Sequence, residues 1–247
     1  MARVVAIIPA RLASKRFPRK VLYPIKDKPL IYYVWRAVGR AKRIDRLFVA
    51  TDSVEIGRAV NAFGGAVIMT SGRPRNGSER AAEAAAELKA DLVVNIQADN
   101  LALSGSVLDR VIASMLDDRA IEYATLATPI VGRKWRERLY NPNVVKVVED
   151  EHGNAAWFSR YPIPFIREAG NRRRVELYPF LEHIGVYFFR KTALMEYASW
   201  RPGRAERAES LEQLRILENG KRIRLYRTRM PSISVDTEDD LRKMKIS

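Results

Sequence analysis

The chain has 247 residues, of which 47% are hydrophobic, and carries a formal net charge of +15 from 44 Lys and Arg against 29 Asp and Glu. A chain of this length and composition can bury a large core, which argues against an intrinsically disordered protein. The absence of cysteine excludes disulfides and thiolate zinc sites, and no apolar run reaches the roughly 18 residues of a membrane span.

The first hundred residues alternate between apolar runs rich in β-branched residues and amphipathic helical patterns. Strands are predicted at 4–9, 46–52, 66–70 and 91–99, with helices between them at 29–42, 53–64 and 78–89. This alternation predicts a parallel sheet with helices on both faces. Ligands bind such sheets beyond the carboxyl ends of the strands. In this chain those ends carry PAR at 9–11, ATD at 50–52 and QAD at 97–99.

After about residue 120 the pattern becomes less regular. Further strands are predicted at 124–130, 143–150, 183–190 and 222–228, and helices at 191–198 and 210–219. A last helix is expected after residue 234, capped by Asp236 or Thr237. We therefore expect one domain over residues 1–247, with a smaller lobe inserted in its second half.

The segment PARLASKRFPRK at 9–20 places five cations directly after the first strand: Arg11, Lys15, Arg16, Arg19 and Lys20. It contains no glycine and is not a Walker A loop, so side chains rather than backbone amides would have to bind a phosphate. A triphosphate would supply the counter-charge that keeps these cations together. The alternative is a solvent-exposed basic loop without a ligand.

The motif IIPARLASKRFPRKVLYPIKDKPLI at 7–31 resembles the N-terminal signature of sugar nucleotidyltransferases. Further matches follow in the same order: VATDSVEI at 49–56, RNGSER at 75–80, NIQAD at 95–99, NPNVVKVV at 141–148, FSRYPIP at 158–164, EHIGVYFFR at 182–190, LEQLRILENG at 211–220 and SVDTEDDL at 234–241. Together they span essentially the whole chain. The HIGVY and LEQLR blocks resemble the 3-deoxy-manno-octulosonate cytidylyltransferase family more closely than the related acylneuraminate enzymes.

This resemblance implies a Rossmann-like three-layer α/β/α nucleotidyltransferase fold with a mostly parallel sheet and a smaller inserted dimerisation lobe. Residues 1–120 would form the nucleotide-binding half, and residues 121–247 the sugar-binding and dimerisation half, which returns to the main sheet. The implied reaction joins CTP to a 3-deoxy-2-ulosonic acid, Kdo or a close analogue, giving the CMP-sugar and pyrophosphate for surface polysaccharide or lipopolysaccharide synthesis. Mg²⁺, a homodimer and a cytoplasmic location are implied with it.

The resemblance also assigns residues to the nucleotide and the metal. Asp99 and Asp236 would hold Mg²⁺, although each has a simpler interpretation, as the end of a strand and the cap of a helix. Arg11 and Lys20 would bind the triphosphate and take part in catalysis, with Ser14 and Arg16 nearby. Pro9 and Ala10 would contact the nucleotide through their backbone. Ser78 and Arg80 would read cytosine, and Arg80 has the alternative of facing the sugar.

The sugar acid would be bound by residues from four of the matching blocks: Gln97, Arg160, His183, Tyr187, Glu212 and Gln213. His183 lies in a predicted strand, where a single histidine is more often a hydrogen-bonded core residue. The chain also departs from the family pattern at two places. QADNL at 97–101 stands where the family usually has QGDEP, and Arg19 stands where the family has a glycine. The first departure puts the metal affinity and the sugar in question.

Three other functions are compatible with these patterns. One alternative is activation of another nonulosonic acid of the acylneuraminate type. A second is a protein that binds nucleotide or sugar without turnover, in which QADNL marks a decayed metal site. The net positive charge suggests a nucleic-acid-binding protein. Against that alternative, the cations are spread along the chain and no helix-turn-helix, zinc-finger or RNA-binding signature is found, so we expect no nucleic-acid partner.

Overall fold

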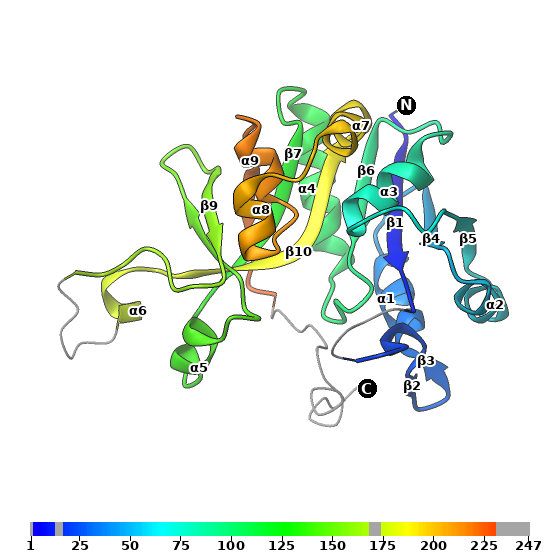
Figure 1. The fold of residues 1–247 in the computed structure, drawn as a ribbon, viewed down its shortest axis with the longest axis horizontal. Coiled ribbons are helices and arrows are strands. Elements are labelled where there is room, and N and C mark those ends of the chain that lie inside the picture. The colour runs from blue at the N-terminus through cyan, green and yellow to red at the C-terminus, as the bar shows by residue number, and fades with distance from the viewer. Residues whose placement is uncertain (1, 13–16, 168–173, 231–247) are drawn as a thin grey trace.

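The central sheet forms from apolar segments of both halves of the chain. In the computed structural model, which describes residues 2–12, 17–167 and 174–230, the strands lie side by side in the order β11-β7-β10-β6-β1-β4-β5 (Figure 1). Their bounds are β1 Val4–Ala10, β4 Arg46–Thr51, β5 Ala66–Met69, β6 Leu92–Ile96, β7 Tyr123–Pro129, β10 Leu181–Arg190 and β11 Arg224–Arg227. β10 runs antiparallel to β6 and β7, whereas the other pairs along this order are parallel.

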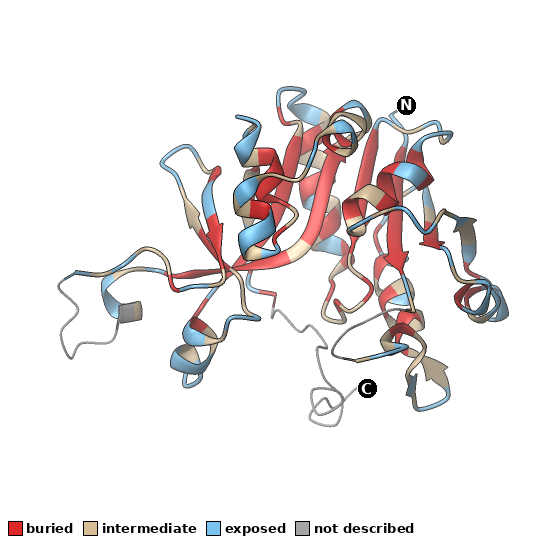
Figure 2. Ribbon diagram, viewed as in Figure 1, coloured by how far each residue is buried: buried red, intermediate tan, exposed pale blue. Residues whose placement is uncertain are grey.

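Helices cover both faces of this sheet, as Figures 1 and 2 show. The strand β1 is buried over its whole length, with alternate side chains entering two different cores. Val4, Ala6 and Ile8 pack with the helices of one face, which are α1 Leu30–Val38, α2 Val54–Ala62 and α4 Gly105–Asp117. Val5 and Ile7 pack with those of the other face, α3 Gly77–Ala85, α7 Lys191–Ser199 and α9 Leu214–Glu218. The predicted three-layer α/β/α fold with a mostly parallel sheet is confirmed.

Two helices, α2 and α3, start at a residue whose side chain caps the helix. Ser53 Oγ accepts a hydrogen bond from the amide of Ile56 at 3.3 Å, and Asn76 Oδ1 accepts one from the amide of Glu79 at 2.8 Å, so α2 and α3 begin after these residues. α1 ends at Val38, four residues before its predicted end, and Gly39, a residue of low helix propensity, follows it. The prediction had no helix at α4, although its apolar residues recur at helical spacing.

Shorter elements connect the layers. After β1 the chain forms the 3₁₀ turn η1 Lys20–Leu22 and a hairpin of β2 Pro24–Ile25 with β3 Lys28–Pro29. α8 Arg204–Glu209 precedes α9. The predicted helix at 210–219 corresponds to α9 alone, because the chain turns at Ser210, which has a left-handed backbone with φ 52°.

A lobe projects from the sheet between β7 and β10, at the left of Figure 1. Its elements are α5 Trp135–Tyr140, β8 Lys146–Glu149, β9 Ala155–Ser159 and α6 Arg174–Leu177. β8 pairs with both β9 and the start of β10, so the lobe continues the main sheet. A small core of its own, built on Ile130, Leu139 and Phe180, supports it. Among the described residues, no helix is both long and apolar enough to cross a bilayer.

Candidate active site

The largest concentration of predicted site residues surrounds a cavity of about 550 Å³. Its walls come from the loops that follow β1 and β6, from β10, and from the segment around α8 and α9. Six of its lining residues are those predicted to bind the sugar acid: Gln97, Arg160, His183, Tyr187, Glu212 and Gln213. Arg11 and Asp99 line it as well. The structure therefore brings residues 200 positions apart in the chain into one site.

A second cavity, of about 80 Å³, adjoins the first and shares Arg11, Asn76, Gly77 and Gln97 with it. Four residues predicted to contact the nucleotide line this smaller cavity: Pro9, Ala10, Arg11 and Arg80. Both cavities lie beyond the carboxyl ends of β1 and β6. This is the edge at which parallel sheets bind ligands.

Lys20 and Asp99 form an ion pair beside these cavities. Lys20 Nζ lies 2.5 Å from Asp99 Oδ2, and both side chains are mostly buried. Lys20 begins η1, directly after Arg19, whose backbone is left-handed with φ 59°. Glycine adopts this conformation most easily, which explains why the family has a glycine at this position. Here Arg19 takes the same conformation and its guanidinium contacts Glu55 on α2.

Gln97 is held in a narrow slot between two glycines. A Cβ atom at Gly77 would lie 2.5 Å from Gln97 Nε2, and one at Gly185 would lie 3.3 Å from Gln97 Cγ. Gln97 Nε2 donates to Glu212 Oε1 at 3.1 Å. The glycines thus allow the Gln97 side chain to cross from β6 to the segment before α9.

Glu212 is a buried carboxylate that lines the larger cavity. Besides Gln97, the backbone amide of Ser78 donates to Glu212 Oε2 at 3.0 Å. Burial raises the pKa of Glu212 to about 7, because the low-dielectric surroundings disfavour its charged form more than these hydrogen bonds favour it. Ser78 itself is 1% exposed, and its hydroxyl accepts a hydrogen bond from Asn95.

His183 is a buried, neutral histidine that also lines the cavity. Its Nε2 lies 2.9 Å from Thr125 Oγ1, and that hydroxyl donates to the carbonyl of Val186 at 2.8 Å. Because the Thr125 hydrogen is used in this way, Nε2 of His183 donates and Nδ1 is left as an acceptor. Burial lowers the pKa of His183 to about 3, so the ring is neutral at physiological pH. His183 is therefore a hydrogen-bonded core residue whose side chain also lines the cavity. A contact between His183 and a sugar stays a prediction.

Tyr187 and Arg160 line the cavity in different ways. Tyr187 donates to Gln213 Oε1 at 3.0 Å, and burial raises the pKa of the phenol, so it remains a hydrogen-bond donor. Arg160 donates to three backbone carbonyls, those of Glu209 at 2.6 Å, Pro142 at 2.9 Å and Ser210 at 3.2 Å. Its guanidinium therefore holds the cavity wall together, and a direct contact with a sugar stays a prediction.

Arg80 is a buried cation at the smaller cavity. It is 4% exposed, its guanidinium lies 3.3 Å from Asp52 Oδ2, and it also donates to Thr70. Asp52 directly follows the strand β4, so the ATD segment that was expected at the binding edge holds Arg80. The predicted residues Ser14, Arg16 and Asp236 lie outside the described residues.

The replaced glycine of QADNL is accommodated without strain. Ala98 is 7% exposed, packs in the core and is not among the described non-glycine residues with positive φ, which are Arg19, Lys26 and Ser210. A methyl group is therefore tolerated beside Asp99. The neighbouring Asn100 is buried and lines the cavity, and its Oδ1 has no hydrogen-bond partner among the described residues.

The prediction missed several charged residues that line the cavity. Glu182, Glu206 and Arg215 are all less than 9% exposed. Arg215 and Glu206 lie in segments rich in charge, which from sequence are typical of a solvent-exposed helix. Arg215 did stand inside the matching LEQLR block, and this was the one signal that pointed to it.

Comparison with known proteins agrees with this geometry. The profile of the cytidylyltransferase family matches residues 5–223. The 3-deoxy-manno-octulosonate cytidylyltransferase of Pelobacter propionicus is 42% identical over 98% of this chain and 96% of its own, and that of Geobacter sulfurreducens is 42% identical over 98% and 97%. The structure of a CMP:2-keto-3-deoxy-manno-octonic acid synthetase complexed with CTP superposes with a TM-score of 0.87 at 34% identity, covering 98% of this chain and 96% of that one.

Proposed function

The chain belongs to the 3-deoxy-manno-octulosonate cytidylyltransferases of the cytidylyltransferase family, and we propose that it transfers CMP from CTP to Kdo. In this reaction a sugar hydroxyl attacks the α-phosphorus of CTP, the bond to the β-phosphate breaks, and pyrophosphate leaves. The product, a CMP-sugar, serves lipopolysaccharide or surface polysaccharide synthesis. CTP is made and used in the cytoplasm, so we place the reaction there.

The arrangement of two cavities supports this proposal most strongly. The residues that match the family's sugar ligands all line the larger cavity. Four residues that match its nucleotide ligands, Pro9, Ala10, Arg11 and Arg80, line the smaller cavity beside it. The larger cavity has a volume of about 550 Å³, within the range of small-molecule sites. Two substrates bound in adjoining cavities would meet at the shared wall of Arg11, Asn76, Gly77 and Gln97. This proximity is what a group transfer between them requires.

The nucleotide would occupy the smaller cavity and the loop after β1. We assign the triphosphate to Arg11, which is exposed at the cavity edge, and to Lys20, with Ser14 and Arg16 as further ligands. Charge-assisted hydrogen bonds from these cations would hold the phosphates and stabilise the charge on the leaving pyrophosphate. The N-terminus of α3, with Ser78 and Arg80, would read cytosine. Residues 1–120 would thus form the nucleotide half of the domain.

The sugar acid would occupy the larger cavity. His183 offers the acceptor Nδ1 and Tyr187 a phenol, while Glu212 and Gln213 offer further polar groups for hydroxyls. The carboxylate of the sugar needs cations, and Arg11, Arg75 and Arg207 line the same cavity. Residues 121–247 supply most of these groups, and Arg11, Arg75 and Gln97 come from the first half of the chain.

The described residues fit a magnesium ion that is held partly by substrate. No group of three or more His, Asp or Glu side chains in this part of the chain is arranged to bind a metal, and Asp99 is the carboxylate nearest the phosphate-binding lysine. Mg²⁺ commonly binds one or two protein carboxylates together with phosphate oxygens and water. We assign Asp99 and Asp236 to it. When bound, the ion would neutralise charge on the α-phosphate.

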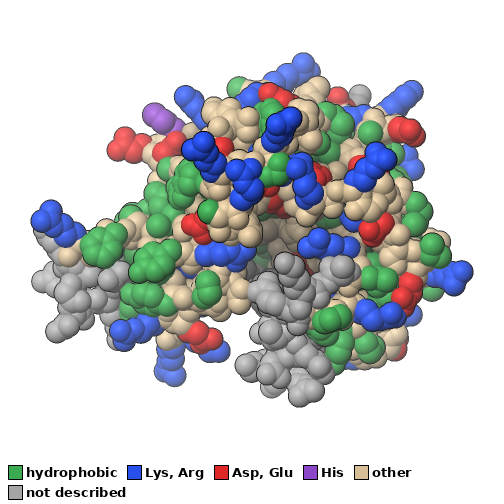
Figure 3. Space-filling model, in the orientation of Figure 1, with side chains coloured by type: hydrophobic (Ala, Val, Ile, Leu, Met, Phe, Trp, Pro, Cys, Tyr) green, Lys and Arg blue, Asp and Glu red, His purple; other side chains and the backbone are tan. Residues whose placement is uncertain are grey.

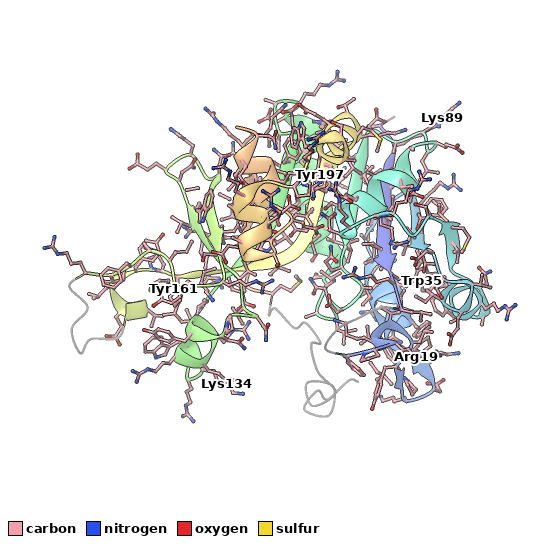
Figure 4. All side chains as sticks on the ribbon, in the orientation of Figure 1. Arg19, Trp35, Lys89, Lys134, Tyr161 and Tyr197 are labelled. Atoms are coloured by element: carbon pink, nitrogen blue, oxygen red, sulfur yellow. The ribbon has the colours of Figure 1, made fainter. Side chains whose placement is uncertain are left out.

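We also propose a homodimer formed through the lobe. Its exposed surface carries large apolar side chains, with Tyr161 and Phe165 each 72% exposed and Val131 69% exposed. Figure 3 shows hydrophobic side chains gathered on the lobe at the left, and Figure 4 marks Tyr161 there. Apolar groups of this size in one region mark a protein interface more often than a free surface. A second copy of the chain is the partner we assign.

The experiment that tests the function measures pyrophosphate release by the purified protein. Reactions would contain CTP, UTP or ATP with Mg²⁺ and with Kdo, its 8-amino analogue or N-acetylneuraminate. We expect release with CTP and Kdo only when Mg²⁺ is present. Release with N-acetylneuraminate instead of Kdo would transfer the assignment to another nonulosonic acid. Binding of CTP without release under any combination would show that the site has lost its activity.

A further inference from the structure

Arg215 is a fully buried cation with no assigned role in the proposed reaction. It lies in α9, is 0% exposed and lines the larger cavity. Its guanidinium binds Glu206 of α8 with two parallel hydrogen bonds, of 2.6 and 2.7 Å. Its Nη1 donates to Glu79 of α3 at 2.9 Å, and its Cζ lies 4.5 Å from the centre of the Tyr197 ring. Three consecutive helices, α7, α8 and α9, are thereby joined to the distant helix α3 at one side chain.

The contact with Glu79 reaches the beginning of α3, where the proposed cytosine-reading residues lie. Glu79 stands between Ser78 and Arg80, and its backbone amide is capped by Asn76 at 2.8 Å. Asn76 Nδ2 in turn donates to the hydroxyl of Tyr197 at 2.9 Å. Figure 4 marks Tyr197 beside α8 and α9, on the face of the sheet that carries α7. The start of α3 is therefore anchored to α7 and α9 rather than only to its own sheet strands.

The same segment is anchored to the proposed sugar site. Arg215 follows Glu212 and Gln213 by only two to three residues, and the amide of Ser78 donates to Glu212 at 3.0 Å. The hydroxyl of Tyr197 donates to the backbone carbonyl of Glu212 at 3.3 Å. A movement of the start of α3 would thus be transmitted to Glu212, and Arg215 is the buried cation that fixes both.

A purely structural role explains the burial of Arg215 less well. Replacing a buried ion pair by apolar residues often leaves stability unchanged or raises it, so stability alone does not call for this arrangement. A planar guanidinium is suited to hold two carboxylates at a defined separation. Its position at the wall of the larger cavity, next to Glu212 and Gln213, is where such a constraint affects ligand binding.

We propose that Arg215 is a positioning residue that couples the two substrate subsites: by holding Glu79 and Glu206 together, it makes CTP and the sugar acid bind more tightly in each other's presence. The inference rests on the proposed function. Binding of cytosine would order the start of α3 and, with it, the Ser78–Glu212 contact. The free-energy cost of ordering this contact when the sugar acid binds would then be smaller. The coupling is reciprocal, as linkage requires.

The test measures CTP affinity by calorimetry in EDTA, with and without saturating Kdo, so that both substrates bind without reacting. We expect the wild-type protein to bind CTP at least about 5-fold more tightly with Kdo present. Glu79→Gln, which weakens the link to α3 and leaves the Arg215–Glu206 pair intact, should bring this ratio close to one. Arg215→Lys, whose ammonium lacks the planar fork, should do the same. In both variants, the affinity for CTP in the absence of Kdo should change by a smaller factor than this ratio does.

Glu149→Gln is the matched control, since it breaks an ion pair with Arg227 between β8 and β11 that does not line the cavity. It should keep the wild-type ratio. The inference is overturned if wild-type CTP affinity is the same with and without Kdo, or if Glu79→Gln keeps the wild-type ratio while melting normally. Pyrophosphate release by the wild-type protein is measured in parallel with Mg²⁺. An active enzyme without coupling contradicts this inference alone, whereas an inactive one contradicts the proposed function.

Discussion

Lys20 Nζ lies 2.5 Å from Asp99 Oδ2, so the lysine assigned to the triphosphate and the carboxylate assigned to magnesium are paired with each other. Each is the counter-ion of the other, and both side chains are mostly buried. Binding of CTP with Mg²⁺ would replace this one contact by two, lysine to phosphate and carboxylate to metal.

Lys20→Met should weaken CTP binding by roughly 10-fold or more, because the triphosphate loses a charge-assisted contact. Lys89→Met is the control, since Lys89 lies at the opposite end of the sheet strands (Figure 4) and should leave CTP binding unchanged. Calorimetric titration of both variants with CTP checks this. If Lys20→Met and the wild-type protein bind CTP with equal affinity, Lys20 does not bind the triphosphate.

Glu212→Gln should change how stability depends on pH. Burial raises the pKa of Glu212 to about 7, above its ordinary value of 4.5, so its contribution to stability is complete below about pH 4.5 and is lost as the pH rises through 7. The neutral glutamine has no such loss. The variant should therefore gain stability relative to the wild-type protein as the pH rises. Between pH 5 and pH 8, the unfolding free energy of the variant minus that of the wild-type protein should increase by on the order of 1 to 3 kcal/mol. Urea unfolding at both pH values measures this, and a difference independent of pH would contradict it.

Gly77→Ala should displace Gln97, because the new Cβ would lie 2.5 Å from Gln97 Nε2. The Gln97–Glu212 hydrogen bond would be lost, and we expect kcat/KM for the sugar acid to fall by roughly 10-fold or more. Gly57→Ala on α2 is the matched control. Its Cβ would meet nothing closer than 3.7 Å, so it should leave kinetics unchanged and stabilise the helix by about 0.5 to 1 kcal/mol. Wild-type kinetics in Gly77→Ala would show that Gln97 does not need this slot.

Replacing Tyr161 and Phe165 together by serine should dissociate the proposed dimer. Both side chains are 72% exposed on the lobe, away from the lobe's own core, so the fold should be retained. Light scattering at micromolar concentration would measure the mass of each protein. We expect a dimer for the wild-type chain and a monomer for the double variant. A monomeric wild-type protein would contradict the proposed dimer. A double variant that remains dimeric would show that the interface lies elsewhere.

Most elements of the first hundred residues were predictable from periodicity alone. Every strand and helix predicted before residue 100 is present, because buried strands such as β1 have an unbroken apolar sequence and two of the three helices have side-chain caps, at Ser53 and Asn76. The second half was harder. Its sheet contains β10, which runs antiparallel to both neighbours, and β8 and β9 depend on pairing within the lobe, which local sequence does not determine.

The site residues were found from motifs, whereas their physical states were not predictable from sequence. Nothing local to His183 indicates that Thr125 and complete burial keep it neutral, because Thr125 lies 58 residues earlier. Arg215 was missed for a related reason. Its partners Glu79 and Glu206 come from two other helices, so only the folded chain shows that this arginine is buried and paired.

We propose that this site makes the CMP-sugar with Asp99 as a required carboxylate. The most direct test is to detect CMP-Kdo by mass spectrometry in timed reactions of wild-type protein and Asp99→Asn with CTP, Kdo and Mg²⁺. We expect product from the wild-type protein and a turnover lower by roughly 10² or more in the variant, with unchanged thermal melting, because carboxylate and amide are nearly isosteric. Near-wild-type turnover in a normally folded Asp99→Asn protein, or no CMP-Kdo from the wild-type chain, would contradict the account.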